Sequence, residues 1–329
     1  MSEDENVEEL LYAAALSGDV AKVRTQLSRG AYVNWQNDTE MTPMHIASAK
    51  GHLDVVEELL DHGAMADMTD QIGQTPLHLA AQQGYINVVK ALLSHGAAVD
   101  AVDEKNEAPL HLAAKYKHLP VIKELLGHGA DIDAVDSEGR DALYWASHRG
   151  RVDIVKELLA RGSTVKDASV NERTALLCAV NCGHSNVVKI LLDHGAAVNS
   201  TTIDGYTLLS QAARKGYTSV VKELLAHGAD VNARNEEDGN TALIWAAERG
   251  LVKMVKELVA HGADVNLANA DGETPLHGAS RNGRLAIIDV LLNAGANSSL
   301  KTLKGKTARE VSSEDAKAWF IKRQKTKDN

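Results

Sequence analysis

The chain has 329 residues, a formal net charge of −10 and only 4% aromatic residues. This acidity argues against nucleic-acid binding by the molecule as a whole, although it leaves room for a local basic face. The sequence has no apolar run of about 18 residues and no charged leader followed by an apolar stretch, so we expect a soluble chain with no membrane span and no secretion.

Residues 1–8 are polar and acidic, and we expect them to form a frayed lead-in to the first helix. Their carboxylates suit the positive end of that helix. The unit that follows, from about Glu9 to Asn34, lacks the helix-start signature of the later units. An end unit with one solvated side is expected to differ in this way.

From Thr42 onward, a pattern returns at a fixed spacing. One unit opens with Thr75-Pro76-Leu77-His78, continues through Gly84 and closes with Gly96-Ala97. Successive units start 33 residues apart, with a single step of 34. A constant period of this length predicts stacked units rather than one globular core. The opening residues are Thr42, Thr75, Ala108, Asp141, Thr174, Thr207, Thr241, Thr274 and Thr307.

Each position of a regular unit has a physical role. The opening threonine is placed to cap the first helix, and the proline after it occupies a position where a missing N–H costs nothing. The histidine is expected to hydrogen-bond back toward the threonine. The glycine ends the helix in a left-handed conformation. In the unit that opens at Thr75, these residues are Pro76, His78 and Gly84.

These columns resemble the ankyrin repeat, and the resemblance covers residues 9–323. It implies an all-α solenoid in which each repeat is a helix-turn-helix followed by a β-hairpin. The resemblance further implies about ten repeats in one curved stack, with the first and last acting as caps and with a concave groove. Such repeats serve mainly as binding surfaces, so a non-catalytic, monomeric protein with a protein or peptide partner is expected.

The middle repeats depart from the pattern. In the fourth repeat, Lys117 replaces the helix-ending glycine and Pro120 enters the second helix early. The fifth repeat has Tyr144-Trp145 where His-Leu is usual, and the hairpin from Ala168 to Arg173 has no glycine at its turn. Positions that break a local rule often mark function or strain. Drift in a tolerant scaffold is the alternative.

The last repeat opens at Thr307, and we expect a short closing helix from about Asp315 to Arg323. Residues 324–329 would then form a flexible tail. The basic residues from Lys322 to Lys325 are interpreted as a solubilising tail, with a nuclear localisation signal as the alternative. We therefore expect a cytoplasmic protein, or else a nuclear one.

No motif for catalysis or cofactor binding is found. The sequence has neither a glycine-rich phosphate loop nor a nucleophile elbow. Thirteen of the 14 histidines fall in repeat columns, where they read as helix-end caps too far apart to share a metal; only His148 lies outside the columns. The two cysteines, Cys178 and Cys182, make a poor zinc site on their own. We expect no enzyme activity, no metal and no cofactor.

The residues just before the helix-ending glycines form a basic stripe. In repeats two to nine, seven of these sixteen residues are Lys or Arg and one is acidic. Aromatic residues lie among them, and aromatics with arginine are the usual anchors of protein interfaces. We predict that an acidic, partly apolar partner segment binds here on the concave face, centred on repeats four to eight. The predicted contacts are Lys115, Tyr116, Trp145, His148, Arg149, Arg173, Tyr206, Arg214, Lys215, Arg249 and Arg281.

The hairpin tips are mostly acidic, with apolar exceptions that include Trp35 and Ile72, and we add these two residues to the predicted site. The competing interpretation of the stripe is that cations merely complement helix C-termini, a gain of about 0.3 to 1 kcal/mol each. Acidic tips beside the groove would repel phosphates, which argues against a nucleic-acid partner. A scaffold or adaptor, an inhibitor that sequesters a signalling or transcription protein, and an effector of an intracellular microbe all fit this sequence.

The resemblance also raises a modification. Some ankyrin repeats are substrates of an asparaginyl hydroxylase that acts on a hairpin asparagine preceded by an acidic and an apolar residue. Asn232, after Asp230-Val231, and Asn266, after Asp264-Val265, match this pattern.

Overall fold

The computed structural model describes residues 6–165 and 174–327, and within them the chain forms nineteen helices. Packing divides the chain into two compact units, Met1–Thr164 and Val165–Asn329, which we describe separately. The all-α repeat architecture expected from the sequence is confirmed. A single continuous stack over residues 9–323 stays a prediction.

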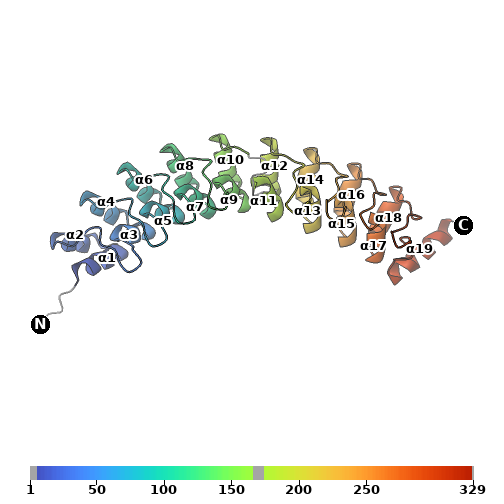
Figure 1. Cartoon of the computed structure of the whole chain (residues 1–329), viewed down its shortest axis with the longest axis horizontal. Coiled ribbons are helices and arrows are strands. Elements are labelled where there is room, and N and C mark those ends of the chain that lie inside the picture. Colours follow the sequence, from blue (N-terminus) through green and yellow to red (C-terminus); the bar gives the residue numbers. More distant parts are fainter. Residues whose placement is uncertain (1–5, 166–173, 328–329) are drawn as a thin grey trace. The chain divides into compact units, whose positions relative to one another are not determined.

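The first unit consists of five helix pairs, and its first and second helices form two rows (Figure 1). Helix α5 packs against α3 and α7, while α6 packs against α4 and α8. Leucines such as Leu77 on α5 and Leu92 on α6 are fully buried between neighbours. The first helices are α1 (Val7–Ser17), α3 (Pro43–Lys50), α5 (Pro76–Gln83), α7 (Pro109–Tyr116) and α9 (Ala142–His148). The second helices are α2 (Val20–Ser28), α4 (Leu53–Asp61), α6 (Ile86–Ser94), α8 (Leu119–Gly127) and α10 (Val152–Ala160).

The second unit repeats this arrangement with four helix pairs and one further helix (Figure 1). Helix α13 packs against α11 and α15, and α14 against α12 and α16. The closing helix α19 (Glu314–Lys327) extends past the predicted end at Arg323. The paired helices are α11 (Ala175–Cys182), α12 (Ser185–Asp193), α13 (Leu208–Lys215), α14 (Thr218–Ala226), α15 (Ala242–Arg249), α16 (Val252–Ala260), α17 (Pro275–Arg281) and α18 (Leu285–Asn293).

The loops between repeats are tighter than the predicted β-hairpins. In the described ranges, β pairing is limited to the isolated bridges Thr201–Thr207 and Lys301–Thr307. Elsewhere a loop closes as a turn, as where the Asp70 N–H donates to the Gln74 carbonyl (3.0 Å). The arms are too short for a longer ladder. Within the described ranges, neighbouring turns instead bond to one another, as where the Glu104 N–H donates to the Ile72 carbonyl (3.0 Å).

The histidine of the opening motif joins two repeats. The Thr75 N–H donates to Nδ1 of His78 (3.1 Å), so Nδ1 is unprotonated and the ring proton sits on Nε2. Nε2 donates to the Glu107 carbonyl of the next repeat (3.0 Å). The predicted bond back to the helix start is confirmed. Because one ring nitrogen accepts and the other donates, the two hydrogen bonds together require a neutral imidazole. The same pair of bonds occurs at His45, His111 and His277.

The predicted left-handed glycine at the end of the first helix is confirmed at Gly84, which has φ 83°. Lys117 adopts the same conformation with φ 77°, an uncommon one for a residue with a side chain. Lys117→Gly should therefore raise the free energy of unfolding by about 0.5 to 1 kcal/mol, because glycine avoids the left-handed penalty and gives back only part of it as unfolded-state entropy. Urea denaturation followed by circular dichroism measures the change.

The matched control is Lys156→Gly in the middle of α10, where the backbone is helical and the side chain is exposed. That substitution should lower the free energy of unfolding by about 1 kcal/mol. Changes of the same sign in both variants would contradict the conformational argument.

Burial lowers the pKa values of His45, His78 and His277 below their ordinary value. Below about pH 6.5, the unfolded chain then binds protons that the folded chain refuses, so these groups stabilise the fold above that pH and the stabilisation is lost as pH falls. We expect the urea concentration at the unfolding midpoint to decrease as the pH is lowered from 7 to 5. In the His78→Asn variant this decrease with pH should be smaller. Equal slopes for the two proteins would show that this histidine is not responsible.

Candidate functional site

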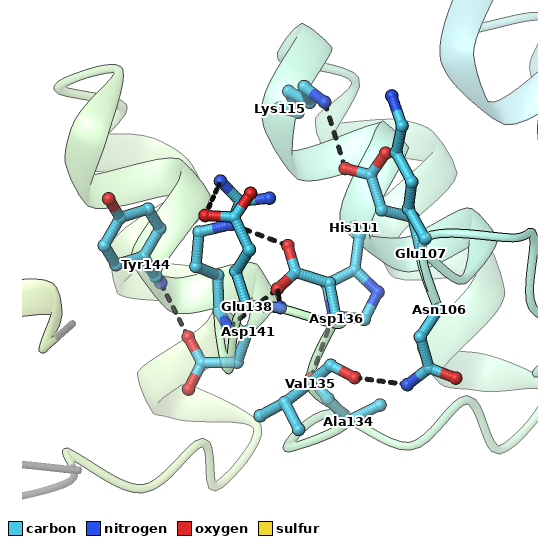
Figure 2. Close-up of polar contacts among 12 residues, drawn as sticks. Asn106, Glu107, His111, Lys115, Ala134, Val135, Asp136, Glu138, Asp141 and Tyr144 are labelled. Atoms are coloured by element: carbon cyan, nitrogen blue, oxygen red, sulfur yellow. Dashed lines mark hydrogen bonds and ion pairs between the residues drawn. The ribbon is translucent and has the colours of Figure 1, made fainter. Parts of the chain in front are cut away.

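The predicted basic stripe lies at the ends of the first helices of the repeats, and its charge depends on pairs of residues eight positions apart in the sequence. In the fourth, seventh and ninth repeats, the loop residue just before the helix cap contacts the residue eight positions later, near the helix end. In the fourth repeat, Lys115 Nζ donates to Glu107 Oε1 across 3.0 Å (Figure 2). Lys115, one of the predicted contact residues, therefore already has a carboxylate partner, and the Glu107 side chain that supplies it is buried. Comparing the residue just before each helix cap with the residue eight positions later would have revealed this pair from the sequence.

Trp145 lies between two cations of the first unit. Lys115 Nζ is 4.5 Å from the ring centre, and the Arg140 guanidinium carbon is 4.4 Å from it. The indole is only 8% exposed and belongs to the packed interior, so little of its surface is accessible, and its predicted contact with a partner stays a prediction. Arg140 was missed by the sequence analysis, and it is held by Asp136 at 2.7 Å and Glu138 at 3.2 Å.

The other predicted contacts of the first unit differ in accessibility. Tyr116, Arg149 and Ile72 are exposed. His148 is half-buried, and its ring lies 6.1 Å from that of Trp145. Trp35 is half-buried and meets Tyr12 edge to face at 6.1 Å. Arg173 lies outside the described residues.

In the second unit, the residue eight positions before Arg214 is aromatic rather than acidic. The Arg214 guanidinium carbon lies 4.8 Å from the centre of the Tyr206 ring, and its Nε and Nη2 donate to Gln211 Oε1 at 3.1 and 3.0 Å. Gln211 in turn donates to Asn181 Oδ1 (2.8 Å). Arg214 is therefore positioned by neutral groups, which leave its charge uncompensated.

Two more cations adjoin Arg214. Lys215 Nζ donates to the Asn181 carbonyl (2.9 Å), and Arg249 donates to the Arg214 carbonyl. We call Arg214, Lys215 and Arg249 the α13–α15 basic patch. Within residues 174–327, no carboxylate forms an ion pair with any of the three.

Arg281 does not belong to this patch electrostatically. It forms an ion pair with Glu273, the residue eight positions earlier, and this hydrogen bond raises the pKa of Arg281. Burial raises the pKa of the nearby carboxyl of Glu248. Arg281, like Lys115, therefore has its charge compensated by a glutamate, and its predicted contact with a partner stays a prediction.

The two candidate hydroxylation sites are half-buried links between repeats. Asn232 Oδ1 accepts from the Asp264 N–H (2.8 Å), and Asn266 Oδ1 accepts from the Asn297 N–H (2.7 Å). Their amide groups donate onward to Gly262 and Gly295 carbonyls at 3.4 and 3.2 Å. Both side chains are engaged in stacking, and whether they are modified stays a prediction.

The two units carry different net charges. Residues 1–164 hold 14 Lys and Arg against 26 Asp and Glu, a net charge of −12, whereas residues 165–329 hold 21 against 19, a net charge of +2. An anionic ligand is therefore repelled by the first unit taken as a whole. The second unit, with its slight positive net charge, suits such a ligand better.

Comparisons with known proteins identify the repeats. A family model for ankyrin repeats in three copies matches residues 10–103, 95–169, 163–235 and 209–302. No curated protein matches the chain significantly. None of the helices in the described part combines the length and apolar character required to traverse a bilayer. With matches that reach from residue 10 to residue 302, the chain belongs to the ankyrin-repeat family, whose members generally act as protein-protein interaction modules.

Proposed function

We propose that the chain is a non-catalytic interaction protein whose α13–α15 basic patch binds an acidic, partly apolar segment of a protein partner. The observation that carries this proposal is the uncompensated charge of Arg214, Lys215 and Arg249. The site is narrower than the stripe expected from the sequence, because Lys115 and Arg281 are neutralised by glutamates.

Neighbouring groups suit a partner of this kind. Tyr206 stacks under Arg214 and Gln211 holds its Nε and Nη2, which fixes the guanidinium and leaves Nη1 available to a carboxylate. Ile203, on the same loop, is among the most exposed apolar side chains of the protein. A segment that alternates acidic and apolar residues would match this combination of cations, aromatic ring and exposed apolar group.

Interaction with helix ends explains part of the patch but does not cancel its charge. Lys215 and Arg249 each bond to a carbonyl at the end of the preceding first helix, which is favourable by about 0.3 to 1 kcal/mol. A carbonyl dipole leaves a full positive charge on each side chain. Three such charges can still steer and hold an anionic segment.

Charge reversal tests the proposal. A variant with Arg214→Glu, Lys215→Glu and Arg249→Glu should lose a specific set of proteins in a quantitative pull-down from nuclease-treated cell extract at low salt, read by mass spectrometry. An acidic segment from one of those proteins should then bind the variant at least about tenfold more weakly, or about 1.4 kcal/mol. Its affinity for the wild type should fall as salt rises, because exposed charges are screened.

The matched control carries Lys189→Glu, Lys253→Glu and Lys256→Glu on the second helices α12 and α16, which gives the same change in net charge on exposed positions. It should retain the partners. Equal loss in both variants would reduce the effect to net charge, and an unchanged partner set in the patch variant would refute the site. Circular dichroism checks that both variants fold.

A further inference from the structure

A pocket of about 240 Å³ opens in the first unit beside α5 and α7. Its lining includes Ile72 from a loop, Gln82 from α5, and Lys115 and Tyr116 at the end of α7. Small-molecule sites usually measure about 300 to 1,000 Å³, so this volume better suits one side chain of a partner protein.

Hydrogen bonds hold the pocket's rim in place. The Glu104 N–H donates to the Ile72 carbonyl (3.0 Å), and the Asp103 N–H donates to the Glu107 carbonyl (3.1 Å). His78 fixes the same Glu107 carbonyl through Nε2 (3.0 Å). A ligand would therefore meet a preformed site rather than order one, which lowers the entropic cost of binding.

Two exposed apolar groups flank the opening. Ile72 is 52% exposed and Tyr116 is 44% exposed, although exposing large apolar side chains to water is unfavourable. They belong to neighbouring repeats and both line the pocket. An aliphatic stem between them would remove apolar surface from solvent on both sides.

The polar lining favours a donor. Glu107 is only 4% exposed and uses Oε1 for Lys115, while no donor in the described ranges reaches its Oε2. The Glu104 carboxylate and the Gln82 amide have no hydrogen-bond partner among the residues that the structure describes. Three carboxylates (Asp103, Glu104 and Glu107) and two lysines (Lys105 and Lys115) line the pocket, in a unit of net charge −12.

We propose that this pocket receives a single arginine side chain from an extended segment of a partner protein. The aliphatic part of the arginine packs between Ile72 and Tyr116. The guanidinium lies against the Tyr116 ring and donates to Glu107 Oε2, the Glu104 carboxylate and the Gln82 amide oxygen. Figure 2 shows the contact between Lys115 and Glu107, in which Lys115 bonds to one oxygen of the carboxylate.

Arginine fits these acceptors better than the alternatives. Its planar group presents five donors in a fixed fork, which can reach acceptors on separate residues, whereas a lysine ammonium is a compact and strongly hydrated point charge. An acidic side chain would face three carboxylates, and of the two lysines in the lining Lys115 is already paired with Glu107, which leaves Lys105 as the one cation of the described lining without an ion pair. The site differs from the α13–α15 basic patch in unit and in the charge of its ligand, so each proposal can fail without the other.

Peptide titration of the full chain tests the pocket. The probe is acetyl-Gly-Leu-Arg-Leu-Gly-amide, followed by ¹⁵N NMR up to about 10 mM, above the roughly 1 mM dissociation constant expected for a single anchored side chain. Saturable shifts should cluster at the loops and helix ends around Ile72, Gln82 and Tyr116. The same peptide with citrulline, which keeps the shape without the charge, should bind at least about tenfold more weakly.

A double variant, Glu104→Gln with Tyr116→Ala, should bind the arginine peptide at least about tenfold more weakly than the wild type does. The matched control is Glu57→Gln with Tyr32→Ala, which removes one carboxylate and one ring from exposed positions of the same unit outside the pocket. It should bind as the wild type does, and so should the triple charge-reversal variant of the α13–α15 basic patch. Equal binding of arginine and citrulline peptides, preference for a glutamate peptide, equal loss in the control, or no saturable shift would each overturn the proposal.

Discussion

Each repeat of this protein depends on hydrogen bonds that only the next repeat can complete. His78 sends its ring proton to the Glu107 carbonyl, and Asp67 Oδ1 accepts the Ala98 N–H of the following repeat (2.8 Å). Asn232 and its neighbour at Asp264 make the equivalent link in the second unit (2.8 Å). In an isolated repeat water would take the place of these partners, so each lost link forfeits the net contribution of an internal hydrogen bond, about 0.5 to 1.5 kcal/mol. Stacking is therefore a requirement of the loops as much as of the apolar core.

The same constraint determines where charge is available. Because the loop lies against the first helix, the residue before the cap meets the residue eight positions later in the fourth, seventh and ninth repeats. Glutamate at the first position neutralises a cation at the second, as at Glu107 with Lys115 and at Glu273 with Arg281. Tyrosine at the first position holds Arg214 in place without neutralising it. One loop substitution can thus turn a structural cation into one that is free to bind a partner.

The sequence carried enough information for the fold but less for the site. The repeat spacing and the residues at helix starts and ends determine structure within a few residues of themselves. They therefore predicted the positions of the helices and the hydrogen bond from the opening-motif histidine to the helix start. The surroundings of Lys115 and Trp145 could not be predicted, because Glu107 and Arg140 meet them only after the loop folds back on the helix. Exposure of Ile72 beside Tyr116 likewise depends on two repeats at once, and the pocket between them has no signature in either repeat alone.

Electrostatics argues against a single acidic ligand along the whole predicted stripe. The stripe's cations in the first unit sit within a net charge of −12, and Lys115 there is paired with Glu107. At physiological salt, charges more than about 8 Å apart are largely screened, so each binding surface responds mainly to its own surroundings. Those surroundings favour a guanidinium at Glu104 and Glu107 and a carboxylate at Arg214 and Lys215. A partner segment that binds one of these surfaces well should bind the other poorly, so under the two proposals the two units would select different sequences with one fold.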